Sequence, residues 1–224
     1  MKEVKIKLNT AKTRVSEETK KRIIKAAGEI FGHKGFQKTT IRDIACAANV
    51  NLAAVNYHFG GKQELYRIVI EDIFKKGFEK FPSTPDDPDR YTPEKKLHWF
   101  IRSAIYRFLS NEGWQGMTGP GRLIAREFLN PSPAFADMID TQIKPHKDIL
   151  VAIIQEISGK QDENAVLPCV LSVMGQCIYY AFASPVIQRL AEDLSPVEKN
   201  LDTITEHIFR FSLNGIQHIT THRR

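Results

Sequence analysis

One stretch near the N-terminus constrains the fold more than any other, because its cap and turn residues leave room for only two very short helices. Thr40 stands three residues before Asp43, a spacing at which a hydroxyl caps a helix and the acid returns the hydrogen bond. Asn49 tolerates a positive φ, and Asn51 can cap the helix that follows. Two short helices joined by so tight a turn are typical of a helix-turn-helix.

Apolar residues at three- and four-residue spacings extend this unit on both sides. We predict helices at about 16–35, 41–48, 52–59 and 62–81. Glycines end the first and third of these helices, because glycine readily adopts the left-handed conformation found after a helix. The first thirteen residues, 1–13, are rich in lysine, and we expect them to form a flexible basic arm.

A proline-rich segment divides the chain into two domains. Residues 82–93 contain four prolines together with aspartates and an arginine, which is the composition of a linker. We therefore expect a helix-turn-helix domain at 14–81 and a C-terminal domain at 94–224. In the C-terminal domain we predict helices at about 94–111, 119–129, 133–158, 163–183 and 196–219, with a turn near 186–192. Since no pattern of period two persists, we expect an all-α protein.

The positive charge of the chain is concentrated in the N-terminal quarter. Residues 1–62 hold 13 Lys and Arg against 5 Asp and Glu, a net charge of +8, whereas the whole chain carries +6. Such a local excess suits the phosphate backbone of double-stranded DNA, because each neutralised phosphate releases counterions. A merely solvated basic surface is the alternative, which charge alone does not exclude.

The predicted helix at 52–59 has the side chains that a recognition helix needs in the major groove. Asn56 can form two hydrogen bonds with an adenine, and Tyr57 can reach a phosphate or a base edge. Ala53 or Ala54 can touch a thymine methyl group. We therefore predict that this helix reads operator DNA.

Residues 39–66, TTIRDIACAANVNLAAVNYHFGGKQELY, closely resemble the signature of the TetR family of one-component repressors. The resemblance covers both short helices, the turn and the start of the next helix without a gap. Asn56 replaces a tyrosine that is frequent in the family, and Asn49 replaces a frequent glycine. The positions that touch operator DNA in the family correspond here to Thr40, Arg42, Tyr57, His58 and Lys62.

A weaker resemblance, to the CecR-like branch of this family, lies in residues 126–150 and 173–182. It implies an effector pocket among the C-terminal helices and a dimer interface built from the last two long helices. Polar side chains that converge in an apolar pocket orient small molecules. Aromatic residues at helical spacing often only fill a core. The candidate pocket residues are Trp114, Arg122, Arg126, Phe128, His146, Met174, Gln176 and Tyr179. Arg126 and its neighbour Glu127 are equally compatible with a surface pair.

Residues 165–188 contain no charged side chain and invite comparison with a membrane span. Pro168 and Gly175 interrupt the run, and neither an aromatic belt nor a basic flank accompanies it. We expect instead a helix that is buried from both sides, with the second side covered by a partner subunit. The first ten residues lack the continuous apolar segment of a secretory signal, so we expect a cytoplasmic protein with no membrane partner.

The sequence contains no pattern that predicts an enzyme, a cofactor or a metal site. We find no glycine-rich phosphate loop and no nucleophile or zinc-protease motif. His218 and His222 have the spacing of two metal ligands on one helical face, but Arg223 and Arg224 would repel a cation there. We predict neither catalytic residues, nor cofactors, nor a metal.

Together these features predict a cytoplasmic homodimeric repressor of two helical domains that leaves its operator when a small-molecule effector binds. The helix at 62–81 is the expected lever, because it joins the DNA-reading unit to the linker. Three alternatives stay open: an activator or effector-independent DNA-binding protein of the same fold, an enzyme with a helical DNA-binding domain, and a membrane-bound sensor based on residues 165–188.

Overall fold

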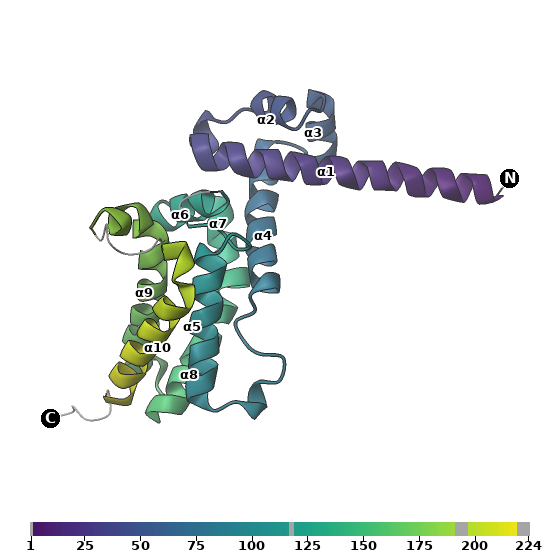
Figure 1. Cartoon of the computed structure of the whole chain (residues 1–224). Helices are drawn as coiled ribbons and strands as arrows, with labels where there is room; N and C mark the ends of the chain where they lie inside the picture. The colour runs from purple at the N-terminus through teal and green to yellow at the C-terminus, as the bar shows by residue number, and fades with distance from the viewer. Residues whose placement is uncertain (1, 117–118, 191–196, 219–224) are drawn as a thin grey trace.

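The computed structural model describes residues 2–116, 119–190 and 197–218, with the backbone alone for 2–14 and 198. Throughout this part the chain is helical and forms no strand, which confirms the predicted all-α class. The N-terminal helices form a head that stands on a larger helical bundle, and one long helix runs from the head into the bundle (Figure 1).

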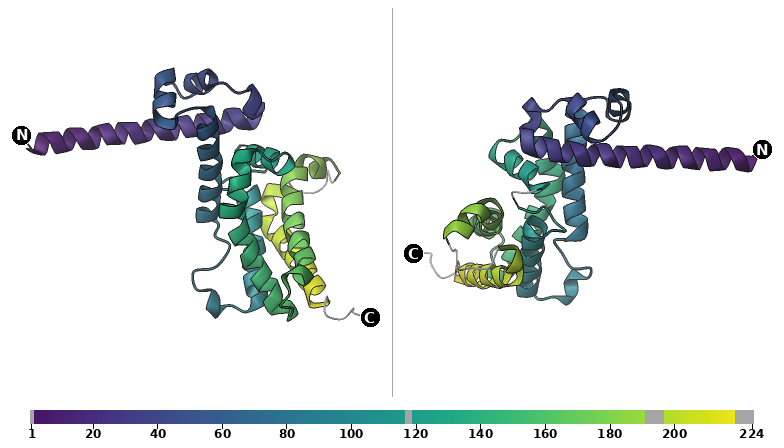
Figure 2. Two further views of the ribbon diagram at one scale, coloured as in Figure 1. Left: turned by 180° about the vertical axis from the view of Figure 1, so that it is seen from behind. Right: turned by 45° about the horizontal axis from the view of Figure 1, so that its top comes forward.

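The head contains the first four helices, α1 (Lys2–Lys38), α2 (Ile41–Ala47), α3 (Leu52–Phe59) and α4 (Lys62–Lys80). Gly35, with a φ of 77°, bends α1 near its end, where we expected that helix to stop. Residues 2–13, expected as an arm, instead continue α1 away from the body (Figures 1 and 2). The sequence explains this difference, because neither proline nor glycine interrupts the chain before Gly28.

The bundle contains the remaining elements, which are η1 (Pro88–Arg90), α5 (Pro93–Leu109), α6 (Gly121–Leu129), α7 (Pro133–Met138), the π-helical η2 (Ile139–Ile143), α8 (Lys144–Ser158), α9 (Glu163–Leu190), η3 (Val197–Lys199) and α10 (Leu201–His218). The predicted helix at 133–158 therefore contains a π-helical turn. The turn predicted near 186–192 is wrong up to Leu190, because α9 continues through Pro185. Residues 191–192, Ile219 and His222 lie outside the described residues.

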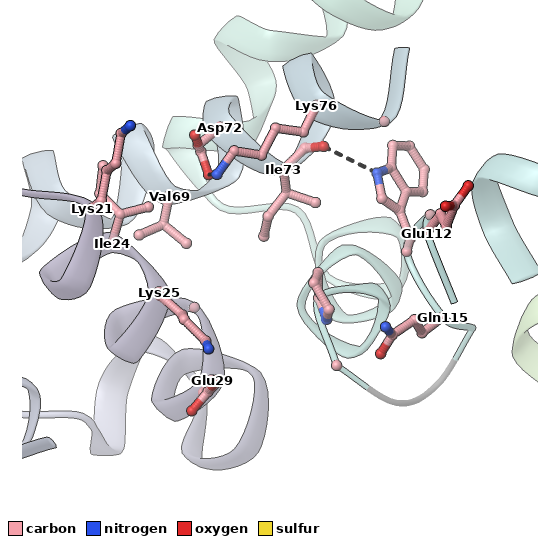
Figure 3. A pocket seen from close by; sticks show the side chains of 16 residues that line it. Lys21, Ile24, Lys25, Glu29, Val69, Asp72, Ile73, Lys76, Glu112 and Gln115 are labelled. Carbon is pink, nitrogen blue, oxygen red and sulfur yellow. Dashed lines mark hydrogen bonds and ion pairs between the residues drawn. The ribbon is translucent and has the colours of Figure 1, made fainter. Parts of the chain in front are cut away.

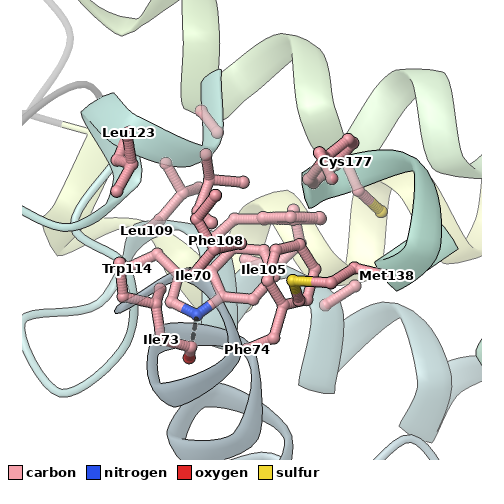
Figure 4. Packing of buried hydrophobic residues seen from close by; sticks show 14 of the residues in the cluster. Ile70, Ile73, Phe74, Ile105, Phe108, Leu109, Trp114, Leu123, Met138 and Cys177 are labelled. Atoms are coloured by element: carbon pink, nitrogen blue, oxygen red, sulfur yellow. Dashed lines mark hydrogen bonds between the residues drawn. The ribbon is translucent and has the colours of Figure 1, made fainter. Parts of the chain in front are cut away.

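The core of the bundle is formed by side chains from α4 through α9 (Figure 4). Phe74, Ile105, Trp114, Met138 and Cys177 are all buried there. Complete burial of one such large side chain contributes roughly 1.5–3 kcal/mol relative to exposure. Since α4 packs on α1 of the head and also on α5 and α7 of the bundle, it anchors the head to the bundle. Helices α9 and α10 pack on each other at the side of the bundle remote from α4 (Figures 1 and 2).

Candidate functional site

The start of α2 is held by the predicted capping box. The Asp43 backbone N–H donates to Thr40 Oγ1 at 3.1 Å, and the Thr40 N–H donates to Asp43 Oδ2 at 3.0 Å. Lys34 Nζ lies 3.3 Å from the same carboxylate. The hydrogen bonds from Thr40, followed by that from Lys34, hold the pKa of Asp43 below its usual value. These contacts fix the direction in which α2 begins.

The turn between α2 and α3 also has the predicted form. Asn49 adopts a φ of 51°, and the Ala54 N–H donates to Asn51 Oδ1 at 2.6 Å. Val55 and Phe59 are buried against the rest of the head. Because the inner edge of α3 is packed and its start is capped, the opposite edge is held outward.

The outward edge of α3 carries the candidate base-reading side chains. Tyr57 is 85% exposed, and Ala53 and Asn56 are exposed beside it. Ala54 and His58 are half-buried, and the His58 ring packs edge-on against Tyr57 at 5.2 Å between centroids. On the preceding helix and its cap, Arg42 and Thr40 are both exposed. Apart from Lys62, the predicted DNA-contacting residues therefore gather on two adjacent short helices and their caps.

Lys62, at the first residue of α4, makes contacts within the head. Its Nζ donates to the carbonyl oxygens of Phe36 at 2.9 Å and Thr39 at 3.0 Å, and it lies 4.4 Å from the Phe36 ring centroid. These carbonyls lie at and just beyond the end of α1, where helical carbonyls lack partners and attract cations. In this structure Lys62 thus ties α4 to α1, a role that the sequence did not indicate.

Two arginines expected in the effector pocket instead join the bundle to the head. On α6, Arg126 donates to the carbonyl oxygens of Gly32 at 3.1 Å and His33 at 3.2 Å. Arg122, one turn earlier, forms a hydrogen bond with the His33 ring. A Cβ on Gly35 would lie 2.8 Å from Arg126, so glycine permits this close approach. Both arginines can therefore transmit a movement of α6 to α1.

A buried hydrogen-bond network links α4 to α6 behind these arginines. The Tyr66 hydroxyl donates to Glu127 Oε1. Glu127 Oε2 accepts from the Ser132 N–H at 2.9 Å and from its hydroxyl at 2.8 Å. Burial, and secondly the Glu127 carboxylate, raise the pKa of Tyr66. Glu127 is buried and bonded to α4, so the alternative of a surface pair with Arg126 is wrong.

Trp114 and His146 lie in the core of the bundle, near the lower end of α4. Trp114 Nε1 donates to the Ile73 carbonyl oxygen at 3.1 Å (Figure 4). The His146 ring stacks on Phe78, with 3.5 Å between ring centroids. Burial, and secondly the charge of Arg107, lower the pKa of His146 to about 4, so its ring is neutral at neutral pH.

Arg107, on α5, is a buried cation that the sequence analysis missed. Its guanidinium lies 4.0 Å from the centroid of the Phe78 ring and donates to the Phe81 carbonyl oxygen at 2.5 Å. The available signal was its position, because it follows Phe100 by seven residues on the apolar stripe of that helix. An arginine at such a position points into the core rather than toward solvent.

The remaining candidate effector residues lie elsewhere. Phe128 packs between Phe135 and Phe182. On α9, Met174 is half-buried and Tyr179 is 55% exposed. Gln176 donates to the Ser212 hydroxyl on α10 at 3.2 Å. The eight residues therefore do not all line one cavity: Trp114 and His146 both contact Phe78, whereas Arg122 and Arg126 contact α1.

A cleft of about 740 Å³ opens where the head meets the bundle (Figure 3). One wall is α1, with Lys21, Lys25 and Glu29, and the other includes α4 and the segment that joins α5 to α6. Of the predicted effector residues, Trp114 alone contributes to its wall. The cleft is large enough for a drug-sized molecule.

Within the described part of the chain, no group of three His, Cys, Asp or Glu side chains is placed to hold a metal ion. In the same part, α9 is the one helix that is long and apolar enough to cross a membrane. It packs against α5, α8 and α10, so it is a component of the bundle.

Both halves of the chain match known families. Residues 23–69 match the family described as bacterial regulatory proteins, tetR family. Residues 93–216 match the C-terminal domain of the HTH-type transcriptional dual regulator CecR.

Individual relatives agree with these matches. The chain is 30% identical over 152 residues to the probable HTH-type transcriptional regulator YttP of Bacillus subtilis, covering 67% of this chain and 69% of YttP. It is also 30% identical over 156 residues to CecR of Shigella flexneri, covering 67% and 70%. In fold it resembles a TetR-like regulator from Rhodococcus sp. RHA1, with a TM-score of 0.62, 16% identity, and coverage of 88% and 95%.

The family matches fit the geometry of the head, in which capped short helices present α3 outward. They also cover most of the bundle, which carries the CecR-type domain. Regulators of this family bind operator DNA and act as dimers, and they are not enzymes. The chain belongs to the TetR family of DNA-binding transcriptional regulators, in its CecR-like branch.

Proposed function

We propose that this protein is a cytoplasmic, homodimeric repressor that is released from a palindromic operator when a small molecule binds its C-terminal bundle. The proposal that this protein reads DNA rests on the outward edge of α3. Its exposed Asn56 and Tyr57 stand on a helix whose other edge is buried and whose start is capped. A rigidly held helix of this kind can enter a major groove.

The surface of α9 and α10 supports dimer formation. Large apolar side chains are exposed there, namely Leu171, Tyr179, Val186, Leu190 and Phe211. An exposed apolar surface of this kind marks a place where another molecule binds. A second copy of this chain would cover it by packing the same two helices symmetrically. The same contact accounts for the apolar composition of α9 without a membrane.

Effector release would act through α4 and α6. Helix α4 spans both domains, and α6 contacts it through Tyr66 and contacts α1 through Arg126. A ligand that binds better to one arrangement of these helices shifts the protein toward it. The expected loss of operator affinity is about 5–150-fold, the usual range of such coupling.

An activator of the same fold is the second candidate. It is favoured by one observation, the name of the relative CecR, which describes a dual regulator. Transcription from a promoter that carries the selected operator, measured with and without this protein, separates the two roles. Increased transcription would contradict the repressor and support the activator.

The test of operator binding is selection of bound sequences from a random duplex library by the purified protein, followed by a salt titration. We expect a palindrome whose half-sites are about 34–36 Å apart and whose affinity falls steeply with salt. Tyr57→Ala should weaken binding about 5–150-fold. Tyr91→Ala, which removes an exposed tyrosine of the linker, is the matched control. Failure to enrich any sequence would overturn the proposal.

A further inference from the structure

The cleft where the head meets the bundle has an apolar floor. It is lined by Ile24 of α1, Ile73 of α4 and Trp114 of the segment that joins α5 to α6 (Figure 3). Gly28 lines it as well, and a Cβ there would meet only Val69, at 3.5 Å, so glycine leaves room beside the floor. With a volume of about 740 Å³, the cleft can bury most of a small apolar molecule.

On the wall formed by α4 and the segment after α5, the carboxylates are already paired. Lys76 Nζ lies 2.6 Å from Asp72 Oδ2 on the same helix. Glu112 Oε2 lies 3.2 Å from Lys80 Nζ. Each carboxylate of this wall therefore has a cation beside it and presents little free negative charge to a ligand.

The wall formed by α1 carries two lysines without such partners. Lys21 and Lys25 are exposed and one helical turn apart, and neither forms an ion pair with a carboxylate of the described residues. Glu29 follows one turn later, so two positive charges and one negative charge leave this wall with a net charge of +1. A single positive charge beside an apolar floor is complementary to a monovalent anion with an apolar body.

DNA binding by α3 does not account for these two lysines. Lys21 and Lys25 line the side of α1 that faces the bundle, whereas α2 and α3 lie on the opposite side of that helix (Figures 1 and 3). Part of the positive charge of the N-terminal quarter is therefore directed into the cleft, away from the recognition helix.

We propose that this cleft binds an organic monocarboxylate with an apolar body. The carboxylate lies between the ammonium groups of Lys21 and Lys25, and the apolar body packs on the floor. Exposed lysines can adjust to such a ligand, because the ammonium group stands on a flexible four-carbon stem. This inference rests on the proposed function, because it assigns a site and a chemical class to the effector.

A ligand in this cleft contacts the parts of the chain that set the position of the head. Helix α1 supplies the lysines, α4 supplies Ile73, and Trp114 belongs to the bundle. Outside the cleft, α1 approaches the bundle closely at Gly32, where a Cβ would lie 3.7 Å from the Gly119 carbonyl oxygen. A molecule that fills the cleft on one side of this contact favours one angle between α1 and the bundle. Helices α2 and α3 follow α1, so the ligand changes the position of the recognition helix.

The test is a titration of the full-length protein that follows Trp114 fluorescence in a Trp99→Phe background, which leaves one tryptophan in the chain. The acids are 4-phenylbutanoate, 3-cyclohexylpropanoate and octanoate, each compared with its primary amide and with the amine of the same skeleton. We expect at least one acid to change the fluorescence saturably and to bind about 2–30-fold more tightly than its amide, the effect of two partly solvated ion pairs. Equal affinity of acid and amide, tighter binding of the amine, or no binding of any acid would overturn the proposal.

Substitutions assign the binding to the cleft. Lys21→Met combined with Lys25→Met should weaken acid binding about 2–30-fold and remove the advantage of the acid over its amide. Lys75→Met combined with Lys95→Met, which removes two exposed lysines outside the cleft, should leave both affinities unchanged. Gly28→Leu should exclude acid and amide alike, because its side chain fills space that Gly28→Ala leaves largely open. A preference for the acid that persists without Lys21 and Lys25, or full binding to Gly28→Leu, would overturn the proposal.

Operator affinity, measured by fluorescence anisotropy with and without the acid, separates the two proposals. A loss of about 5–150-fold would support both. Acid binding in the cleft with unchanged operator affinity would retain the site and contradict effector release. If no operator exists, the fluorescence titrations still decide the site, because they require no DNA.

Discussion

A cation holds each end of α4 by donating hydrogen bonds to carbonyl oxygens at or just beyond the end of a helix. The surroundings of the two cations differ. At the upper end, half-buried Lys62 binds carbonyls at the end of α1. At the lower end, Arg107 binds the carbonyl that ends α4 itself, from the interior of the bundle. The upper cation keeps contact with solvent, whereas the lower one has lost nearly all of its hydration.

This difference indicates different roles for similar contacts. A charge-assisted hydrogen bond near the surface contributes about 1.5–3 kcal/mol, since little hydration is lost. In the interior the desolvation of the cation offsets most of that gain. We infer that the upper contact stabilises the head, and that the lower contact contributes little net stability. Four predictions test this contrast.

The largest effect is expected for Gly77→Ala, at the lower end of α4. The new Cβ would lie 2.3 Å from Trp114 Nε1, so the indole must move and lose its bond to the Ile73 carbonyl. Overpacking together with the lost bond should lower the free energy of unfolding by about 3 kcal/mol, measured by urea denaturation. Gly28→Ala, whose Cβ would meet only Val69 at 3.5 Å, is the control. Equal stability of the two variants would show that Trp114 does not pack on α4.

The next effect concerns the network that joins the upper part of α4 to α6. Glu127→Ala leaves the Tyr66 hydroxyl and the Ser132 N–H without their acceptor. The free energy of unfolding should fall by about 2 kcal/mol, the usual cost of a buried unsatisfied group. Glu127→Gln retains an acceptor and should lose less. A smaller loss for the alanine variant than for the glutamine variant would contradict the assigned network.

The contacts of Glu127 and Arg107 could not be predicted from the sequence, whereas the local structure of the head could. The caps at Thr40 and Asn51 and the positive φ of Asn49 depend on residues three or four apart, and the structure confirms each of them. The contacts of Glu127 and Arg107 depend on partners 61 and 26 residues away. No local pattern encodes such partners, since tertiary packing brings them together.

The same reason explains why the contacts of the candidate effector residues were not predicted. Helical spacing identifies Arg126 and Gln176 as polar residues on apolar helices, but it does not say which neighbouring helix each one meets. In the structure Arg126 contacts α1 and Gln176 contacts α10. Lys62 differs in another way, because its position at the start of α4 was predicted while its carbonyl partners were not. Sequence patterns therefore predict the position of a polar residue along the chain more reliably than the groups that it contacts.

A direct comparison of the two cations gives the third prediction. Lys62→Met should lower the free energy of unfolding by about 1.5 kcal/mol, because two carbonyls lose a charged donor. Arg107→Met should change it by less than about 1 kcal/mol, since the lost bonds are offset by the removal of a buried charge. Both values come from urea denaturation without ligand. A larger loss for Arg107→Met would make the lower contact structural and contradict the inferred contrast.

The smallest effect is a pH dependence that arises at the lower end of α4. The pKa of His146 is lowered to about 4 in the folded protein, below its ordinary value of 6.5, so between these values the unfolded chain binds more protons. Stability is therefore lost as pH falls from about 6.5 toward 4. After allowance for solvent screening, the loss between about pH 7 and pH 5 is about 1 kcal/mol. His146→Phe keeps an aromatic ring on Phe78 and should flatten this part of the pH profile, whereas His207→Phe, at an exposed histidine, should leave it unchanged. Identical profiles for the wild type and His146→Phe would mean that the imidazole is as hydrated in the folded protein as in the unfolded chain, and the site around Arg107 would then be open to water.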